Sequence, residues 1–148
     1  MFQEGDIVEI PLPDGGVAIG WILHLSKHFK NAVGFVVAGI KGQLRDDVTI
    51  DPRTGNPSAM KVLGPLYTHI DNLTLCGWRV YAHQPISESK RMLTKRRVGG
   101  DVYVGDDYIG SIEELDAQTL RPMLLMGMPV VYMEIAKVFG KQGDGSKL

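Results

Sequence analysis

The chain has 148 residues, of which 44% are hydrophobic and 22% are charged, so it can bury the core of one domain without a disulfide or a structural metal. Its 16 Lys and Arg against 17 Asp and Glu leave a net charge of −1, which excludes a general polyanion binder and a strongly acidic nucleic-acid mimic. The single cysteine, Cys76, cannot form an internal disulfide.

The N-terminal segment carries the clearest secondary-structure signals. Residues 6–10 alternate and are rich in β-branched side chains, residues 11–16 form a Pro-, Asp- and Gly-containing turn, and residues 17–25 resume a strand pattern. This order predicts a β-hairpin with a loop longer than two residues. Gly15 and Gly16 tolerate a positive φ, and we expect them to fix the turn.

The middle of the chain is less regular. A continuous apolar run at residues 33–38 predicts a buried third strand. Residues 44–64 are polar and interrupted by Pro and Gly, so we expect a long loop with at most a short strand near residues 48–50. Two further strands are expected at residues 66–70 and 78–82.

A basic segment follows at residues 87–98. It has little periodic apolar content, so we expect a mobile or edge segment rather than a core helix. Acidic residues come directly after it, and a basic lobe beside an acidic lobe could steer a charged partner. The basic side chains are Lys90, Arg91, Lys95, Arg96 and Arg97.

The C-terminal part is expected to hold a second hairpin and the only helix. Strands at residues 101–104 and 108–112 bracket a Gly-Asp-Asp turn. Residues 116–126 have an apolar face behind an Asp N-cap, although Pro122 requires the helix to start late or to kink. Residues 130–138 predict a final strand or an apolar β-rich run.

These elements predict a mainly β (α+β) fold: a single small curled antiparallel sheet or partly open barrel, with one short helix near the C-terminus. Residues 1–140 would form a single β-rich domain and residues 141–148 a flexible tail. We see no targeting segment and no apolar run approaching the roughly 20 residues of a membrane span, so a cytoplasmic location is expected.

The residues that could carry chemistry do not form a recognisable constellation. His24 and His28 are four residues apart, but they lie where a strand runs into a loop, and no Cys or acid completes a ligand set. No Gly-rich loop leads into a helix to hold a phosphate. We therefore expect no metal, no cofactor and no enzymatic activity.

The two tryptophans are expected to be structural. Trp21 and Trp78 both lie in strand-like segments, and side chains of this size dominate core burial. Period-2 alternation would place Val80 on the same face as Trp78.

Two blocks of the sequence resemble a known family. Residues 5–20 read GDIVEIPLPDGGVAIG, and residues 77–86 read GWRVYAHQPI. In this order, the Gly-Asp start, Pro-Leu-Pro-Asp-Gly turn and later Trp-bearing strand with its Pro turn are similar to the immunity protein 26 family of bacterial polymorphic toxin systems. The resemblance would extend over residues 5–140. It implies a cytoplasmic all-β or α+β protein that protects its producer by binding a cognate toxin, and it carries no catalytic residues.

The leading interpretation is therefore a toxin-neutralising immunity protein that acts by stoichiometric binding and occlusion. A small β-barrel module that uses Lys90 to Arg97 against nucleic acid is the alternative, and a small enzyme with a site hidden in the sequence is a third. A toxin that is a nuclease has a basic cleft, and carboxylates on turns would fit it. Besides Asp46 and Asp47, the expected partner-binding acids are Asp106, Asp107, Glu113 and Glu114, with Tyr103 and Tyr108 as anchors.

Overall fold

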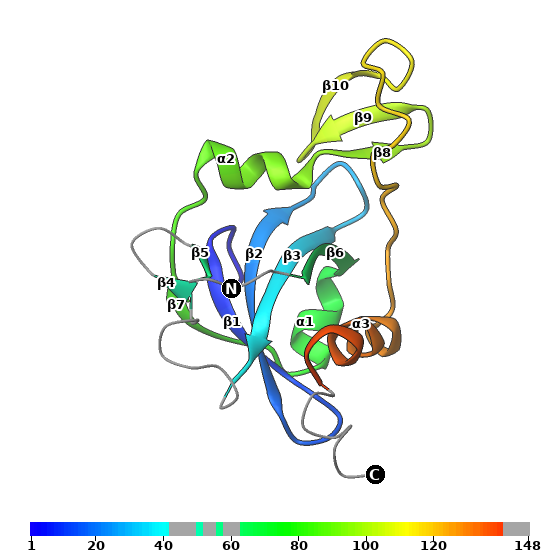
Figure 1. Ribbon diagram of the computed structural model, residues 1–148. Helices are drawn as coiled ribbons and strands as arrows, with labels where there is room; N and C mark the ends of the chain where they lie inside the picture. Colours follow the sequence, from blue (N-terminus) through cyan, green and yellow to red (C-terminus); the bar gives the residue numbers. More distant parts are fainter. Residues whose placement is uncertain (42–49, 52–55, 58–62, 141–148) are drawn as a thin grey trace.

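The computed structural model describes residues 1–41, 50–51, 56–57 and 63–140 (Figure 1). Its main element is a five-stranded antiparallel sheet with strand order β6-β3-β2-β1-β7. The strands are β1 (Asp6–Pro11), β2 (Val17–Leu25), β3 (Ala32–Ile40), β6 (Leu63–His69) and β7 (Arg79–His83). Strands β1, β2 and β3 are neighbours both in the chain and in the sheet, so the predicted hairpin is confirmed.

A second, three-stranded sheet projects from one end of this body (Figure 1). Its strand order is β10-β9-β8, and we call it the small sheet. Its strands are β8 (Arg96–Val98), β9 (Asp101–Val104) and β10 (Asp107–Ser111), and a separate two-stranded ladder pairs β4 (Ile50–Asp51) with β5 (Asn56–Pro57). The fold is thus mainly β, as predicted, although the sequence did not indicate that the small sheet would be separate.

Two helices, α1 and α3, cover one face of the five-stranded sheet, and the buried side chains of both belong to the same core (Figure 1). None of the helices in the described ranges is long and apolar enough to cross a membrane. The helical segments are α1 (Ile70–Leu75), α2 (Glu88–Arg91), the 3₁₀ turn η2 (Met92–Thr94), α3 (Met128–Ile135) and the π-helical turn η3 (Ala136–Gly140).

The central strands are buried on both faces, which explains the continuous apolar run of β3. The face under the helices forms the main core, where Trp78 meets Phe35 edge to face with ring centroids 5.0 Å apart. Trp21 belongs to a smaller cluster of side chains with Ile7 and Val36, and its Nε1–H donates to the backbone oxygens of Gly5 and Gln84. Both tryptophans are therefore core residues.

Strand β7 differs from the expectation in one respect. Trp78 is buried just before the strand begins, whereas Val80 is 45% exposed. The prediction that the two side chains share a face was wrong, because Trp78 lies outside the regular strand and β7 is an exposed edge.

The helix predicted over residues 116–126 was also wrong. Pro122 has no N–H group to donate within a helix. The neighbouring backbone instead bonds to strands: the Met123 N–H donates to the Arg97 oxygen, and the Met126 N–H donates to the Tyr67 oxygen. Residues 121–126, which we call the extended connection, therefore run beside β8 and then β6, with bridges from Pro122 to Arg97 and from Leu125 to Tyr67.

The strand expected over residues 130–138 is helical. Met128, Val131 and Ile135 are buried, which is the spacing of one helix face rather than of a strand. Pro129 lies in the first turn, where a missing N–H costs nothing. The prediction of one short helix near the C-terminus is confirmed, but it begins at Met128.

The basic segment is ordered. Residues 88–98 form α2, η2 and β8, and β8 is an edge strand of the small sheet. The Ser87 hydroxyl accepts from the Lys90 N–H and begins α2. Most of the loop expected over residues 44–64, including Asp46 and Asp47, lies outside the described residues. The expected tail at residues 141–148 lies wholly outside them.

The turn between β1 and β2 depends on Gly15, which has φ +93°, whereas Gly16 is not in the left-handed region. We expect Gly15→Ala to lower the free energy of unfolding by about 1 kcal/mol, because an added Cβ is strained at this φ although it meets no neighbour. Gly100→Ala is the control, since that glycine also has open space but no positive φ. Equal urea midpoints for the two variants would contradict the argument.

Candidate functional site

Four aromatic rings gather where the small sheet meets the turn between β2 and β3. Tyr103 of β9 and Tyr108 of β10 are paired across the strands, with ring centroids 5.7 Å apart. Phe29 and His28 stack against Tyr103 at 4.8 and 5.6 Å. We call these four residues the aromatic cluster, and Tyr108 at its outer end is 58% exposed.

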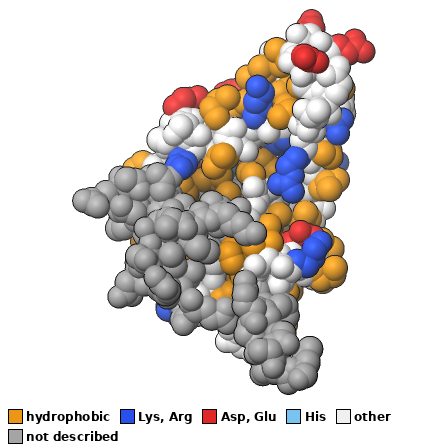
Figure 2. Space-filling model, in the orientation of Figure 1, with side chains coloured by type: hydrophobic (Ala, Val, Ile, Leu, Met, Phe, Trp, Pro, Cys, Tyr) orange, Lys and Arg blue, Asp and Glu red, His pale blue; other side chains and the backbone are white. Residues whose placement is uncertain are grey.

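Acidic side chains accompany the aromatic cluster on the small sheet. Asp107 is exposed and forms an ion pair with Arg91. Glu113 is exposed, and Glu114 accepts from the Ser111 N–H at 3.1 Å while its own N–H donates to the Ser111 hydroxyl. Figure 2 shows acidic side chains at the outer end of the small sheet, with Lys and Arg among hydrophobic side chains between that end and the body.

Asp106, also predicted as a partner-binding acid, is half-buried, and its carboxylate makes contacts within the protein. Its carboxylate accepts from the Ser26 hydroxyl at 2.7 Å and from the N–H groups of Lys27 and His28 at 2.9 and 3.3 Å. It also lies 3.0 Å from Nε2 of His24. Asp106 therefore holds the turn of the small sheet against the end of β2.

The pKa of Asp106 follows from this environment. Burial raises it, but the hydrogen bonds from Ser26, Lys27 and His28 and the neighbouring His24 outweigh burial and lower it from 3.8 to about 2. The pKa of Glu4 is also lowered, chiefly by its hydrogen bond with His24. Both acids are thus stabilised as carboxylates by contacts within the protein.

His24 is the buried centre of this network. Its Nδ1 lies 3.3 Å from a carboxylate oxygen of Glu4 and its Nε2 lies 3.0 Å from one of Asp106, so each ring nitrogen faces a carboxylate of the protein itself. Across the described ranges, no group of three or more His, Cys, Asp or Glu side chains could hold a metal ion.

Arg96 is the other buried ionic residue at the junction of the two sheets. Only 3% of it is exposed, and its Nη1 donates to the backbone oxygens of Thr94 and Gly105 at 3.0 and 2.7 Å. The guanidinium lies over the rings of Phe29 and Tyr67, with centroid distances of 5.3 and 5.1 Å. Burial lowers the pKa of Arg96, and no carboxylate among the described residues is paired with it.

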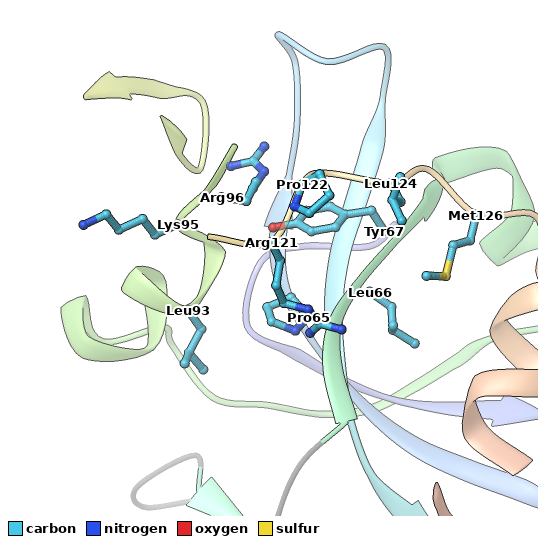
Figure 3. A pocket seen from close by; sticks show the side chains of 10 residues that line it. All are labelled: Pro65, Leu66, Tyr67, Leu93, Lys95, Arg96, Arg121, Pro122, Leu124 and Met126. Atoms are coloured by element: carbon cyan, nitrogen blue, oxygen red, sulfur yellow. The ribbon is translucent and has the colours of Figure 1, made fainter. Parts of the chain in front are cut away.

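A pocket of about 140 Å³ opens beside Arg96 (Figure 3). The sequence alone does not reveal this pocket, because its walls come from β6, the basic segment and the extended connection, which are far apart in the chain. None of its residues stands out in the sequence apart from the basic ones. The lining residues are Pro65, Leu66, Tyr67, Leu93, Lys95, Arg96, Arg121, Pro122, Leu124 and Met126.

Comparison with known proteins identifies no relative: no family model, no curated protein and no solved structure matches this chain.

Proposed function

We propose that this protein neutralises a bacterial toxin by binding it stoichiometrically and covering its active site or substrate path. The observation that carries the proposal is the projecting small sheet, which presents an exposed aromatic anchor next to acidic side chains. Such a combination suits a partner-binding surface, where a buried aromatic holds the complex and charges direct its approach. The sequence resemblance to immunity proteins supports the same class of function.

The contact surface would be centred on β10, the outer strand of the small sheet. Tyr108 and Ile109 are 58% and 44% exposed there, and Leu115 is 39% exposed beside the strand. Two exposed acids near this strand, Glu113 and Asp107, could contact a partner. Asp107 would first have to break its ion pair with Arg91. This surface fits a toxin with a basic cleft, such as a nuclease.

We expect Tyr108→Ala to weaken toxin binding by about 2 kcal/mol, or about 30-fold, because exposed aromatics near the centre of an interface dominate its energy. The measurement is titration calorimetry against a candidate toxin domain, sought first among the products of the neighbouring genes. Tyr81→Ala is the matched control, because Tyr81 is 52% exposed on β7 of the other sheet. Equal affinities of the two variants would rule out β10 as the contact, and no inhibition by the wild-type protein would rule out the function.

The acidic side chains allow a second test of whether the toxin binds at β10. Reversing the charge of Asp107 and Glu113 should slow association at low salt and have little effect at high salt. Asp106 is left unchanged in this variant, because its contacts are internal.

Nucleic-acid binding through Lys90 to Arg97 remains the second candidate, with weaker support. Arg91 is paired with Asp107, Arg96 is buried, and the Arg97 Nε donates to the Leu120 oxygen. Three of the five cations are thus used within the protein. Affinity for a DNA duplex that falls steeply between about 50 and 200 mM salt would favour this candidate.

A further inference from the structure

The pocket beside Arg96 has a strongly uneven distribution of polar groups. Leu66, Leu124 and Met126 give it an apolar side, and Figure 3 shows the Tyr67 hydroxyl directed toward the other side, where Arg96 and Arg121 lie. Among the described residues, its lining includes three cationic ones and no acidic one. The pocket should therefore bind a negatively charged ligand in preference to a neutral or cationic one.

Two buried polar atoms of residues that line the pocket have no hydrogen-bond partner in the described part of the chain. These are the hydroxyl of Tyr67 and Nε of Arg96, on residues that are 5% and 3% exposed. Buried donors are almost always satisfied in proteins, because an unmade hydrogen bond costs free energy. Both atoms can donate, so each would be satisfied by an oxygen of an anion that reaches it.

The charge of Arg96 is a second, independent reason to expect an anionic ligand. A buried cation is normally balanced by a carboxylate, but the described contacts of this guanidinium are two carbonyl oxygens, a Met123 sulfur and two aromatic rings. The carboxylate of Asp106 acts on Arg96 electrostatically without a described hydrogen bond, and an anion in the pocket would give the guanidinium a direct anionic partner. Arg121 is exposed and its side chain makes no described hydrogen bond, so it can move to admit a ligand and then contact it.

The size of the pocket limits the ligand. A cavity of about 150 Å³ holds a molecule the size of benzene, and this pocket measures about 140 Å³. The ligand that combines this volume with the apolar and cationic sides is a carboxylate joined to one small apolar group.

We propose that the pocket lined by Tyr67, Arg96 and Arg121 binds such a carboxylate, with the oxygens facing these three residues and the apolar group against Leu66, Leu124 and Met126. This site is separate from the toxin-contacting surface on β10 and does not depend on the proposed function. The carboxylate can come from a free small acid or from the C-terminus of a protein that ends in an apolar residue.

The first test titrates benzoate into the full-length protein and follows backbone amide signals by NMR. Saturable shifts around β6 and residues 121–126, with a dissociation constant of about 1 mM, are expected for a ligand of this size. Benzamide has the same shape without the charge and should bind at least about tenfold more weakly. Equal binding of benzamide, or no saturable shift with benzoate, would overturn the proposal.

Two variants locate the site. Tyr67→Phe removes a hydroxyl that makes no hydrogen bond with the described residues, so the fold should be retained while benzoate affinity falls about 3- to 10-fold. Arg121→Gln should weaken benzoate to a similar extent. Lys90→Gln is the control, because it makes the same change of charge in α2, away from the pocket lining. Unchanged affinity in both Tyr67→Phe and Arg121→Gln would overturn the site.

A third arm distinguishes the two sources of the carboxylate. A short peptide ending in leucine is compared with the same peptide carrying a C-terminal amide. Competition with benzoate by the free-acid peptide alone supports a protein C-terminus as the ligand. Binding of benzoate without competition by either peptide supports a free small acid.

Discussion

Replacing Trp78 with alanine should lower the free energy of unfolding by about 3–5 kcal/mol, the range measured for truncating a large aromatic side chain in a core. Trp78 is 5% exposed and packs edge to face on Phe35 in the main core. The alanine would leave a cavity between the five-stranded sheet and the helices that cover it. Urea denaturation followed by circular dichroism measures the loss.

Two further variants separate cavity formation from other effects at this site. The Nε1–H of Trp78 has no hydrogen-bond partner among the described residues, so Trp78→Phe removes side-chain volume alone and should cost roughly 1–2 kcal/mol. Tyr81→Ala removes an exposed ring a few residues away and should cost less than about 1 kcal/mol. An unchanged urea midpoint for Trp78→Ala would show that the side chain does not support the core.

Asp106→Ala should be the next most damaging change, with an expected loss of about 2–3 kcal/mol at pH 7. It removes the acceptor for the Ser26 hydroxyl and for the Lys27 and His28 amides, and it leaves His24 without one of its two carboxylates. Asp107→Ala is the neighbouring control, because an exposed ion pair contributes about 0–1 kcal/mol. Similar losses for the two variants would contradict the role assigned to Asp106.

The effect of Asp106 should also depend on pH in a defined direction. Its pKa is about 2 in the folded protein and 3.8 without these contacts, so the unfolded chain binds the proton more tightly. The stabilisation is complete above about pH 4 and is lost as the pH falls toward 2. The difference in stability between wild type and Asp106→Ala should therefore narrow over this interval and stay constant between pH 5 and 7.

The first three strands could be predicted because their signals are local. Alternation over residues 6–10, the turn with Gly15, and the apolar run at 33–38 each act on a few neighbouring residues, and the structure places β1, β2 and β3 there. The C-terminal helix was misplaced because an apolar face after Asp116 resembles a helix, whereas the tertiary bonds of residues 123 and 126 to β8 and β6 decide the conformation. A local pattern does not reveal such bonds.

In the candidate site, too, the features that depend on neighbouring residues could be predicted, and those that depend on distant contacts could not. The proximity of Tyr103 and Tyr108 follows from the predicted hairpin, since the two residues pair across β9 and β10. The contacts of Asp106 lie about 80 residues earlier in the chain, at His24 and Ser26, so its acidic turn looks solvent-exposed in the sequence. The pocket beside Arg96 is likewise assembled from distant segments, and only the folded chain brings them together.

The attachment of the small sheet has a consequence for local opening of the native state. Apart from the bridge between Arg97 and Pro122, strands β8 to β10 pair with one another in the described part of the chain. The other described bonds to the body involve Asp106, Gly105 and Asp107 in and beside one turn, together with Val104 and Arg97. Breaking these few bonds frees residues 96–111 as a group while the five-stranded sheet stays closed. Their amide hydrogens should then exchange with solvent together, and faster than those of β2 and β3, which open only with the whole molecule. A partner bound across β10 and the body would slow this exchange by holding the small sheet in place.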